Sequence, residues 1–86
     1  MSWLALPPSQ RDLAIRVCTR RQVDALRAYF NANGQRRTAA RDLGIDRRTL
    51  DAHITAAMTR VIADSDFDPA PWIAAAHPDT ENATCA

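Results

Sequence analysis

The chain has 86 residues, of which 47% are hydrophobic, 6% aromatic and 24% charged, and its formal net charge is +1. This length allows one domain with a small core, built from aliphatic side chains more than from large rings. The spacing of Cys18 and Cys85 excludes a zinc-finger framework and a disulfide scaffold. No apolar run is long enough for a membrane span and no signal-peptide pattern is present, so we expect a cytoplasmic protein without membrane contact.

Charge is distributed unevenly along the chain. All eleven basic residues are Arg. Residues 1–60 contain eleven Arg and five Asp, a net charge of +6, whereas residues 61–86 contain five acids and no base, a net charge of −5. A basic body followed by an acidic tail is typical of a polyanion binder, with enhanced solubility as the alternative explanation.

A short apolar lead, residues 1–8, ends in two prolines that oppose helix formation. Ser9 has the side chain of an N-cap and is followed three residues later by Asp12. This pair predicts a first helix that runs to about Cys18.

Thr19 and Gln22 predict a capping box at the start of a second helix, since each side chain can bond to the backbone N–H of the other residue. Apolar residues at spacings of three and four form the predicted buried face of this helix: Val23, Leu26 and Phe30, with Tyr29 beside them. Asn33-Gly34 ends the helix, because both residues tolerate the left-handed backbone conformation.

A short third helix is predicted over residues 36–43 and a fourth over residues 47–63, separated by Gly44 and opened by Asp46 as N-cap. The small and apolar residues of the third helix share one face: Ala39, Ala40 and Leu43. The inward stripe of the fourth helix comprises Leu50, Ile54, Ala57, Met58 and Val61. The opposite face of that helix comprises Arg48, Ala52, Thr55 and Thr59.

Residues 64–86 form an acidic tail that contains several prolines. Asp68 as cap and Pro69 in the first turn predict a short helix over residues 69–77, and we expect disorder beyond Pro78. Three tail residues are too apolar to remain in water beside so small a core, and we expect them to pack on the body or on a second copy: Phe67, Trp72 and Ile73.

Residues 36–55 have the pattern of a helix-turn-helix. Ala40 supplies a small side chain where two helices meet at a sharp angle, and Gly44 supplies a turn without Cβ strain. Ile45 and Leu50 then place apolar side chains under the turn and under the second helix. An ordinary helical corner would not need these residues together at these offsets, so the pattern favours the DNA-binding motif.

The stretch "TRRQVDALRAYFNANGQRRTAARDLGIDRRTLDAHITAAMTRV" resembles the helix-turn-helix domain of LuxR-type response regulators, which is related in shape to sigma-factor region four. The matching positions are Thr19, Arg21, Gln22, Leu26, Ala40, Leu43, Ile45, Asp46, Thr49, Leu50 and His53. The sequence departs from the family at Asp51, where a basic residue is usual, and at Gln35, where a serine cap is usual. The resemblance implies DNA binding by a small stand-alone regulator, similar in layout to phage-encoded ones.

The exposed face of the fourth helix supplies candidate contacts to base edges: Arg48, Asp51, Ala52 and Thr55. Arg can bond to guanine with two N–H groups, Thr can contact a thymine methyl group, and Ala allows close approach. Asp51 could accept from cytosine, but a pair with Arg47 or Thr55 along its own helix is the favoured interpretation.

Candidate phosphate contacts lie at the start of the third and fourth helices, where backbone N–H groups and basic side chains suit an anion. These candidates are Arg36, Arg37, Arg47 and Thr49. Such contacts would position the protein on DNA without reading the sequence of the bases.

The sequence contains no set of side chains typical of catalysis, so we expect neither an enzyme nor a cofactor. Asp64, Asp66 and Asp68 match the first half of a calcium loop. Pro69 and Ala75 then occupy the positions that need Gly and Glu, so no metal site is expected.

The sequence therefore predicts an all-α fold: a small helical bundle that contains a helix-turn-helix (residues 9–63), with an extra N-terminal helix and a short C-terminal helix. We expect a sequence-specific binder of double-stranded DNA that acts as a small transcriptional regulator and homodimer, because one motif contacts too few base pairs. Two alternatives stay open. One is the DNA-recognising small subunit of a phage packaging machine, and the other is an adaptor that binds polymerase, sigma factor or another part of the transcription machinery.

Overall fold

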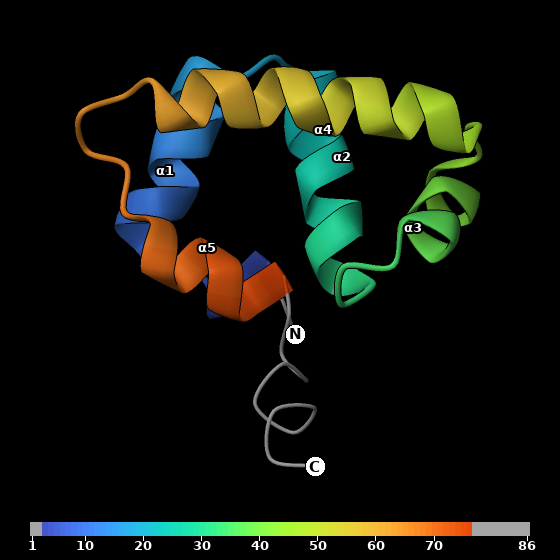
Figure 1. The fold of residues 1–86 in the computed structure, drawn as a ribbon, viewed down its shortest axis with the longest axis horizontal. Helices are drawn as coiled ribbons and strands as arrows, with labels where there is room; N and C mark the ends of the chain where they lie inside the picture. Colours follow the sequence, from blue (N-terminus) through green and yellow to red (C-terminus); the bar gives the residue numbers. More distant parts are fainter. Residues whose placement is uncertain (1–2, 77–86) are drawn as a thin grey trace, which may run out of the picture.

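The computed structural model describes residues 3–76, which form helices joined by turns and short loops (Figure 1). The elements are the 3-10 helix η1 (Trp3–Ala5) and the α-helices α1 (Pro8–Val17), α2 (Arg20–Asn31), α3 (Arg36–Leu43), α4 (Arg47–Ile62) and α5 (Pro69–Ala76). No strand occurs within residues 3–76, and the predicted all-α class is confirmed. The predicted disorder beyond Pro78 lies outside the described residues.

The longest helix, α4, extends across the whole molecule (Figure 1). Helix α1 contacts it at one end and α3 at the other, and α2 contacts it between them. A loop after α4 returns the chain to α5, which lies against α2 and η1. The two ends of the described chain are therefore neighbours on the side opposite α4.

Capping interactions fix the start and end of α2 as the sequence predicts. The Gln22 backbone N–H donates to Thr19 Oγ1 at 3.3 Å, and the Thr19 N–H donates to Gln22 Oε1 at 2.9 Å. At the other end Asn33 and Gly34 have φ angles of 56° and 83°. These two left-handed residues turn the chain sharply toward α3.

The predicted cap of α1 is wrong. This helix begins at Pro8, one residue before Ser9, and no side chain caps it. Pro8 is compatible with the first turn because its fixed φ is helical and its missing N–H has no partner in that turn anyway. Ser9 therefore lies inside the helix, where it is exposed.

Two clusters of buried side chains hold the bundle together. The larger one, here called the aromatic core, lies between η1, α1, α2, α4 and α5 and comprises Trp3, Leu6, Leu13, Ala14, Val23, Leu26, Phe30, Ala57, Val61, Trp72 and Ala75. The smaller one, here called the alanine core, lies between α2, α3 and α4 and comprises Ala25, Ala39, Ala40, Leu50 and Ile54. Met58, the one member of the predicted α4 stripe that is only partly buried, packs against both clusters.

Leu43 differs from the prediction that it shares the buried face of α3. It is 37% exposed, whereas Ala39 and Ala40 are buried. Leu43 is the last residue of a two-turn helix, and the chain turns away at Gly44 directly after it. The following residue, Ile45, packs against the alanine core instead.

The N-terminal lead and the tail meet in the aromatic core. The rings of Trp3 and Trp72 lie edge to face with centroids 6.5 Å apart, and Phe30 lies 5.4 Å from Trp72. Trp72 is only 3% exposed, and Phe67 packs beside it. Two of the three apolar tail residues therefore pack on their own chain, whereas Ile73 is 61% exposed.

A buried glutamine joins the tail to α1. The Gln10 side chain donates to the Asp66 carbonyl at 3.0 Å, and its Oε1 accepts from the Asp68 backbone N–H at 3.1 Å. The same oxygen accepts from the Trp72 indole N–H at 3.0 Å. Because a buried polar group is costly without partners, these three bonds favour a single position of the tail on the body.

Candidate nucleic-acid interface

A tight turn joins α3 to α4. Gly44 has a φ angle of 68°, a left-handed conformation that costs little only for glycine. Its N–H donates to the Arg41 carbonyl at 3.1 Å, and the Ile45 N–H donates to the Ala40 carbonyl at 3.0 Å. Asp46 then caps α4, because its Oδ1 accepts from the Arg48 backbone N–H at 3.3 Å. Two backbone bonds at the end of α3 and the Asp46 side-chain cap at the start of α4 thus hold the turn between the two helices.

Small side chains allow α3 to approach its neighbours closely. Ala39 and Ala40 are buried against α2 and α4, and Leu50 is fully buried in the same cluster. A longer side chain at either alanine would separate the helix axes, which pack 8–10 Å apart according to the side chains at the contact. The geometry of the α3–α4 pair therefore depends on residues with little volume.

The face of α4 opposite its buried stripe is exposed. Arg48, Ala52, Thr55 and Thr59 all lie on it. The Arg48 side chain makes no hydrogen bond or ion pair to any residue within 3–76, and the Thr59 hydroxyl donates back to the Thr55 carbonyl at 2.8 Å. Of the four candidate base contacts, Arg48, Ala52 and Thr55 are thus together on one uncovered surface.

Asp51, the fourth candidate, has a different partner from the one predicted. Arg36 Nε on α3 lies 2.9 Å from Asp51 Oδ1, so the carboxylate pairs across the two helices and not with Arg47 or Thr55. Oδ1 is shielded from water and receives no N–H with hydrogen-bond alignment, so the contact is an ion pair without a directed bond. Both side chains are nearly half exposed, 46% and 44%, which limits its contribution to stability.

The candidate phosphate contacts divide into separate groups. Arg37 and Arg47 line one cleft with Gln35 and Thr38, and its volume is about 420 Å³. The backbone N–H groups that open α3 receive no side-chain cap there. This cleft therefore combines two arginines with a helix N-terminus, a combination that suits a phosphate.

The other two phosphate candidates, Arg36 and Thr49, contact neighbouring side chains instead of facing this cleft. Arg36 borders the cleft, but its guanidinium is directed to Asp51 and lies 5.7 Å from the centroid of the Tyr29 ring. The Thr49 hydroxyl donates to Asp46 Oδ2 at 3.4 Å, and Thr49 lines another hollow together with His53. His53 is half-buried there, in the flanking position that its sequence spacing indicates.

Two features of this region were absent from the sequence-based interpretation. Thr38 donates to Gln35 at 3.3 Å, so the residue before α3 is held by a side chain one turn later. The 15-residue separation of Arg36 and Asp51 gives no local signal, because the two meet only after α3 docks on α4. The first feature could have been found, since Gln35 and Thr38 have the spacing of a cap and its partner.

The acidic stretch after α4 is engaged with α1. Arg16 lies 3.4 Å from Asp64 and 3.8 Å from Asp66. Within residues 3–76 no group of three or more His, Cys, Asp or Glu side chains could hold a metal ion. None of the helices described is long and apolar enough to cross a membrane.

The protein is thus a small all-α bundle. In it a glycine turn joins a short helix, α3, to a longer helix, α4, that has one exposed polar face. Comparison with family models, with curated proteins and with solved structures gives no match for this chain. The resemblance to LuxR-type domains stays a prediction from the residues that carry it.

Proposed function

We propose that this protein binds double-stranded DNA in a sequence-specific manner, with α4 in the major groove, and acts as a small transcriptional regulator. The observation that carries the proposal is the contrast between the two faces of α4. Leu50 fixes one face in the alanine core, while Arg48, Ala52 and Thr55 are exposed on the other. A helix held rigidly with an unused polar face is what direct readout of base edges requires.

The cleft beside α4 supplies the contacts that would orient it. Arg37, Arg47 and the open N-terminus of α3 bind phosphate in this proposal, and Arg48 reads a base. The Arg36–Asp51 pair explains how an acid is tolerated near phosphates, because Arg36 offsets the charge of the carboxylate. Asp51 therefore has a positioning role beside Arg36, and a contact to cytosine would need that pair to open.

Two copies are needed for a useful site, since one motif reads only a few base pairs. We propose a homodimer on two half-sites one helical turn apart. Trp72 and Phe67 are used inside the monomer, so Ile73 is the tail residue that is available to a second copy.

The test is selection of duplexes from a random pool, followed by mobility shifts with selected and scrambled DNA. We expect tight binding to the selected duplex, a loss of preference in Arg48→Ala, and uniformly weaker binding in Arg37→Gln. A plot of log affinity against log salt concentration should have a slope of about −0.9 per phosphate contact. In Arg37→Gln the slope should be less steep by about one unit. Arg20→Gln, an exposed arginine at the start of α2, is the matched control.

Other outcomes would replace the proposal. Equal affinity for every duplex, together with a ring-like oligomer, would favour the small subunit of a packaging machine. No salt-dependent binding to any duplex would favour an adaptor for the transcription machinery.

A further inference from the structure

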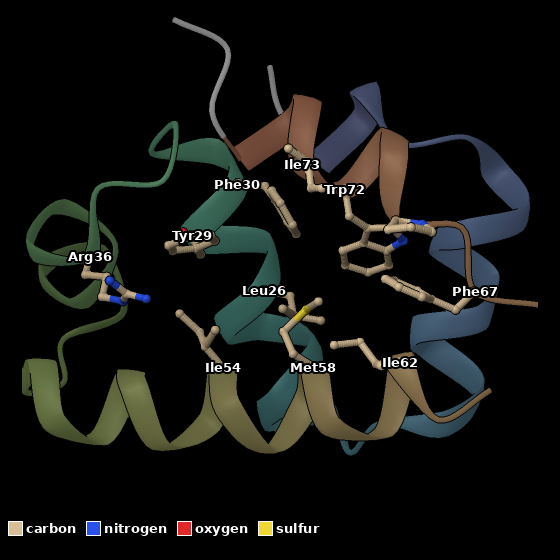
Figure 2. Close-up of a pocket in the computed structure, with 11 residues that line it drawn as sticks. Leu26, Tyr29, Phe30, Arg36, Ile54, Met58, Ile62, Phe67, Trp72 and Ile73 are labelled. Atoms are coloured by element: carbon tan, nitrogen blue, oxygen red, sulfur yellow. The ribbon is translucent and has the colours of Figure 1, made fainter. Parts of the chain in front are cut away.

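An apolar groove lies between α2, α4 and the tail, on the side of α4 away from its exposed polar face (Figure 2). Its volume is about 380 Å³, within the range of small-molecule sites. In Figure 2 the side chains of Ile54 and Met58 point into it from α4, and those of Tyr29 and Phe30 line it from α2. Eleven of the described residues line the groove, and Arg36 is the only charged one among them.

The walls are aromatic. The rings of Tyr29 and Phe30 lie edge to face with centroids 5.5 Å apart, and Phe30 has the same relation to Trp72 at 5.4 Å. Phe30 and Trp72 are buried, so Tyr29 is the one of these three rings that is open to another ring. At the rim Ile62 and Ile73 are 57% and 61% exposed, so an apolar occupant would remove both from water.

Arg36 gives the groove a charged end. Its Nε faces Asp51, and its Nη groups make no hydrogen bond within residues 3–76. A guanidinium can donate two parallel N–H bonds to one carboxylate. The contact with Asp51 uses only Nε, so the Nη donors stay available. The guanidinium also lies over the Tyr29 ring, at the mouth of the apolar space.

We propose that this groove binds a small aromatic carboxylate. The rings of the ligand lie against Tyr29, Met58 and Ile73, and its carboxylate binds the Arg36 guanidinium in competition with Asp51. This inference does not rest on DNA binding.

A second copy of the chain is poorly suited to the groove. Within residues 3–76 the exposed large apolar side chains come one each from η1, α1, α3, α4 and α5: Leu4, Ile15, Leu43, Ile62 and Ile73. No helix therefore presents the row of apolar anchors that helix-in-groove binding needs. Residues 77–86 contain no Val, Leu, Ile, Met, Phe, Tyr or Trp, so their composition does not match the groove either.

The test uses the full chain with 2-naphthoate as the probe and its methyl ester as the uncharged match. Binding is measured by calorimetry and by the Trp72 indole N–H signal in NMR. We expect saturable binding of naphthoate that shifts this signal, and weaker binding of the ester. Arg36→Gln should lower the affinity for naphthoate by roughly tenfold, the change expected for one charge-assisted hydrogen bond. The affinity for the ester should not change. Asp51→Asn should raise the affinity for naphthoate severalfold, because it removes the competing carboxylate.

Arg41→Gln, an exposed arginine of α3 outside the groove, is the matched control and should bind naphthoate like the unaltered chain. If Arg36→Gln fails to fold, the gain expected from Asp51→Asn still decides the matter. Equal affinity for probe and ester, no effect of either variant, or an unchanged Trp72 signal would overturn the proposal. A naphthoate affinity that falls as protein concentration rises would place a second copy in the groove and overturn it as well.

Discussion

The two cores of this small bundle are built in opposite ways. The aromatic core gathers Trp3, Phe30 and Trp72 from three distant parts of the chain, and it joins the N-terminal lead to the tail. The alanine core consists of three alanines with Leu50 and Ile54, and it holds α3 against α2 and α4. Large rings supply buried area, whereas small side chains supply close approach, so we infer that stability depends mostly on the first core and the α3–α4 geometry on the second.

The largest effect should follow from removal of a ring in the aromatic core. Trp72→Ala should lower the free energy of unfolding by about 3–5 kcal/mol, because it removes a buried ring and leaves Gln10 without its indole partner. Urea unfolding measures the change. Ile15→Ala, an exposed aliphatic residue of α1, is the control and should stay within about 0.5 kcal/mol of the unaltered chain. Equal losses in Trp72→Ala and in the control would contradict the packing of the tail in the aromatic core.

In the alanine core the corresponding change is Leu50→Ala. We expect a loss of about 2–5 kcal/mol, since Leu50 is fully buried and the alanines of its cluster cannot fill the space it leaves. Thermal melts measure it, with Thr55→Ala on the exposed face of the same helix as control. A neutral Leu50→Ala would mean that α4 is held from the aromatic core alone.

The sequence predicted the alanine core and its turn because their signals are local. The left-handed conformation of Gly44 and the cap at Asp46 involve residues within a few positions of one another. The buried stripe of α4 also follows from helical spacing alone. Expectations of helix ends and buried faces from such short separations were confirmed, except for Ser9, where Pro8 already opens the helix, and Leu43 at a helix end. The pairing of Asp51 along its own helix was also wrong, because Asp51 pairs with Arg36.

The aromatic core and the groove could not be predicted in that way. Gln10 and Trp72 are 62 residues apart, and their hydrogen bond depends on the path of the whole chain. The sequence showed that Trp72 needed cover but could not decide between the body and a second copy. Asp51 presents the same difficulty on a smaller scale, because Arg36 comes within reach only when α3 and α4 are packed together.

A smaller effect tests the turn that the alanine core supports. Gly44→Ala should cost about 1–2 kcal/mol, the price of left-handed backbone for a residue with a Cβ. No atom lies within 4 Å of the added Cβ, so the cost is conformational and not steric. Gly44→Asn is the matched variant and should cost less, because asparagine tolerates this conformation better. Equal losses in the two variants, measured by urea unfolding, would point to a clash instead.

The smallest effect should come from the cap that starts α2, one of the two helices that contribute to both cores. Thr19→Ala removes the acceptor for the Gln22 N–H and should cost about 1 kcal/mol. Because Thr19 is exposed and neither core loses a side chain, the loss should not depend on which core has been weakened. Thermal melts of Thr19→Ala alone, with Leu50→Ala and with Trp72→Ala should therefore give additive changes within about 0.5 kcal/mol. Non-additivity with only one partner would show that the cap acts through that core, and the comparison between the two cores would need to include the helix that connects them.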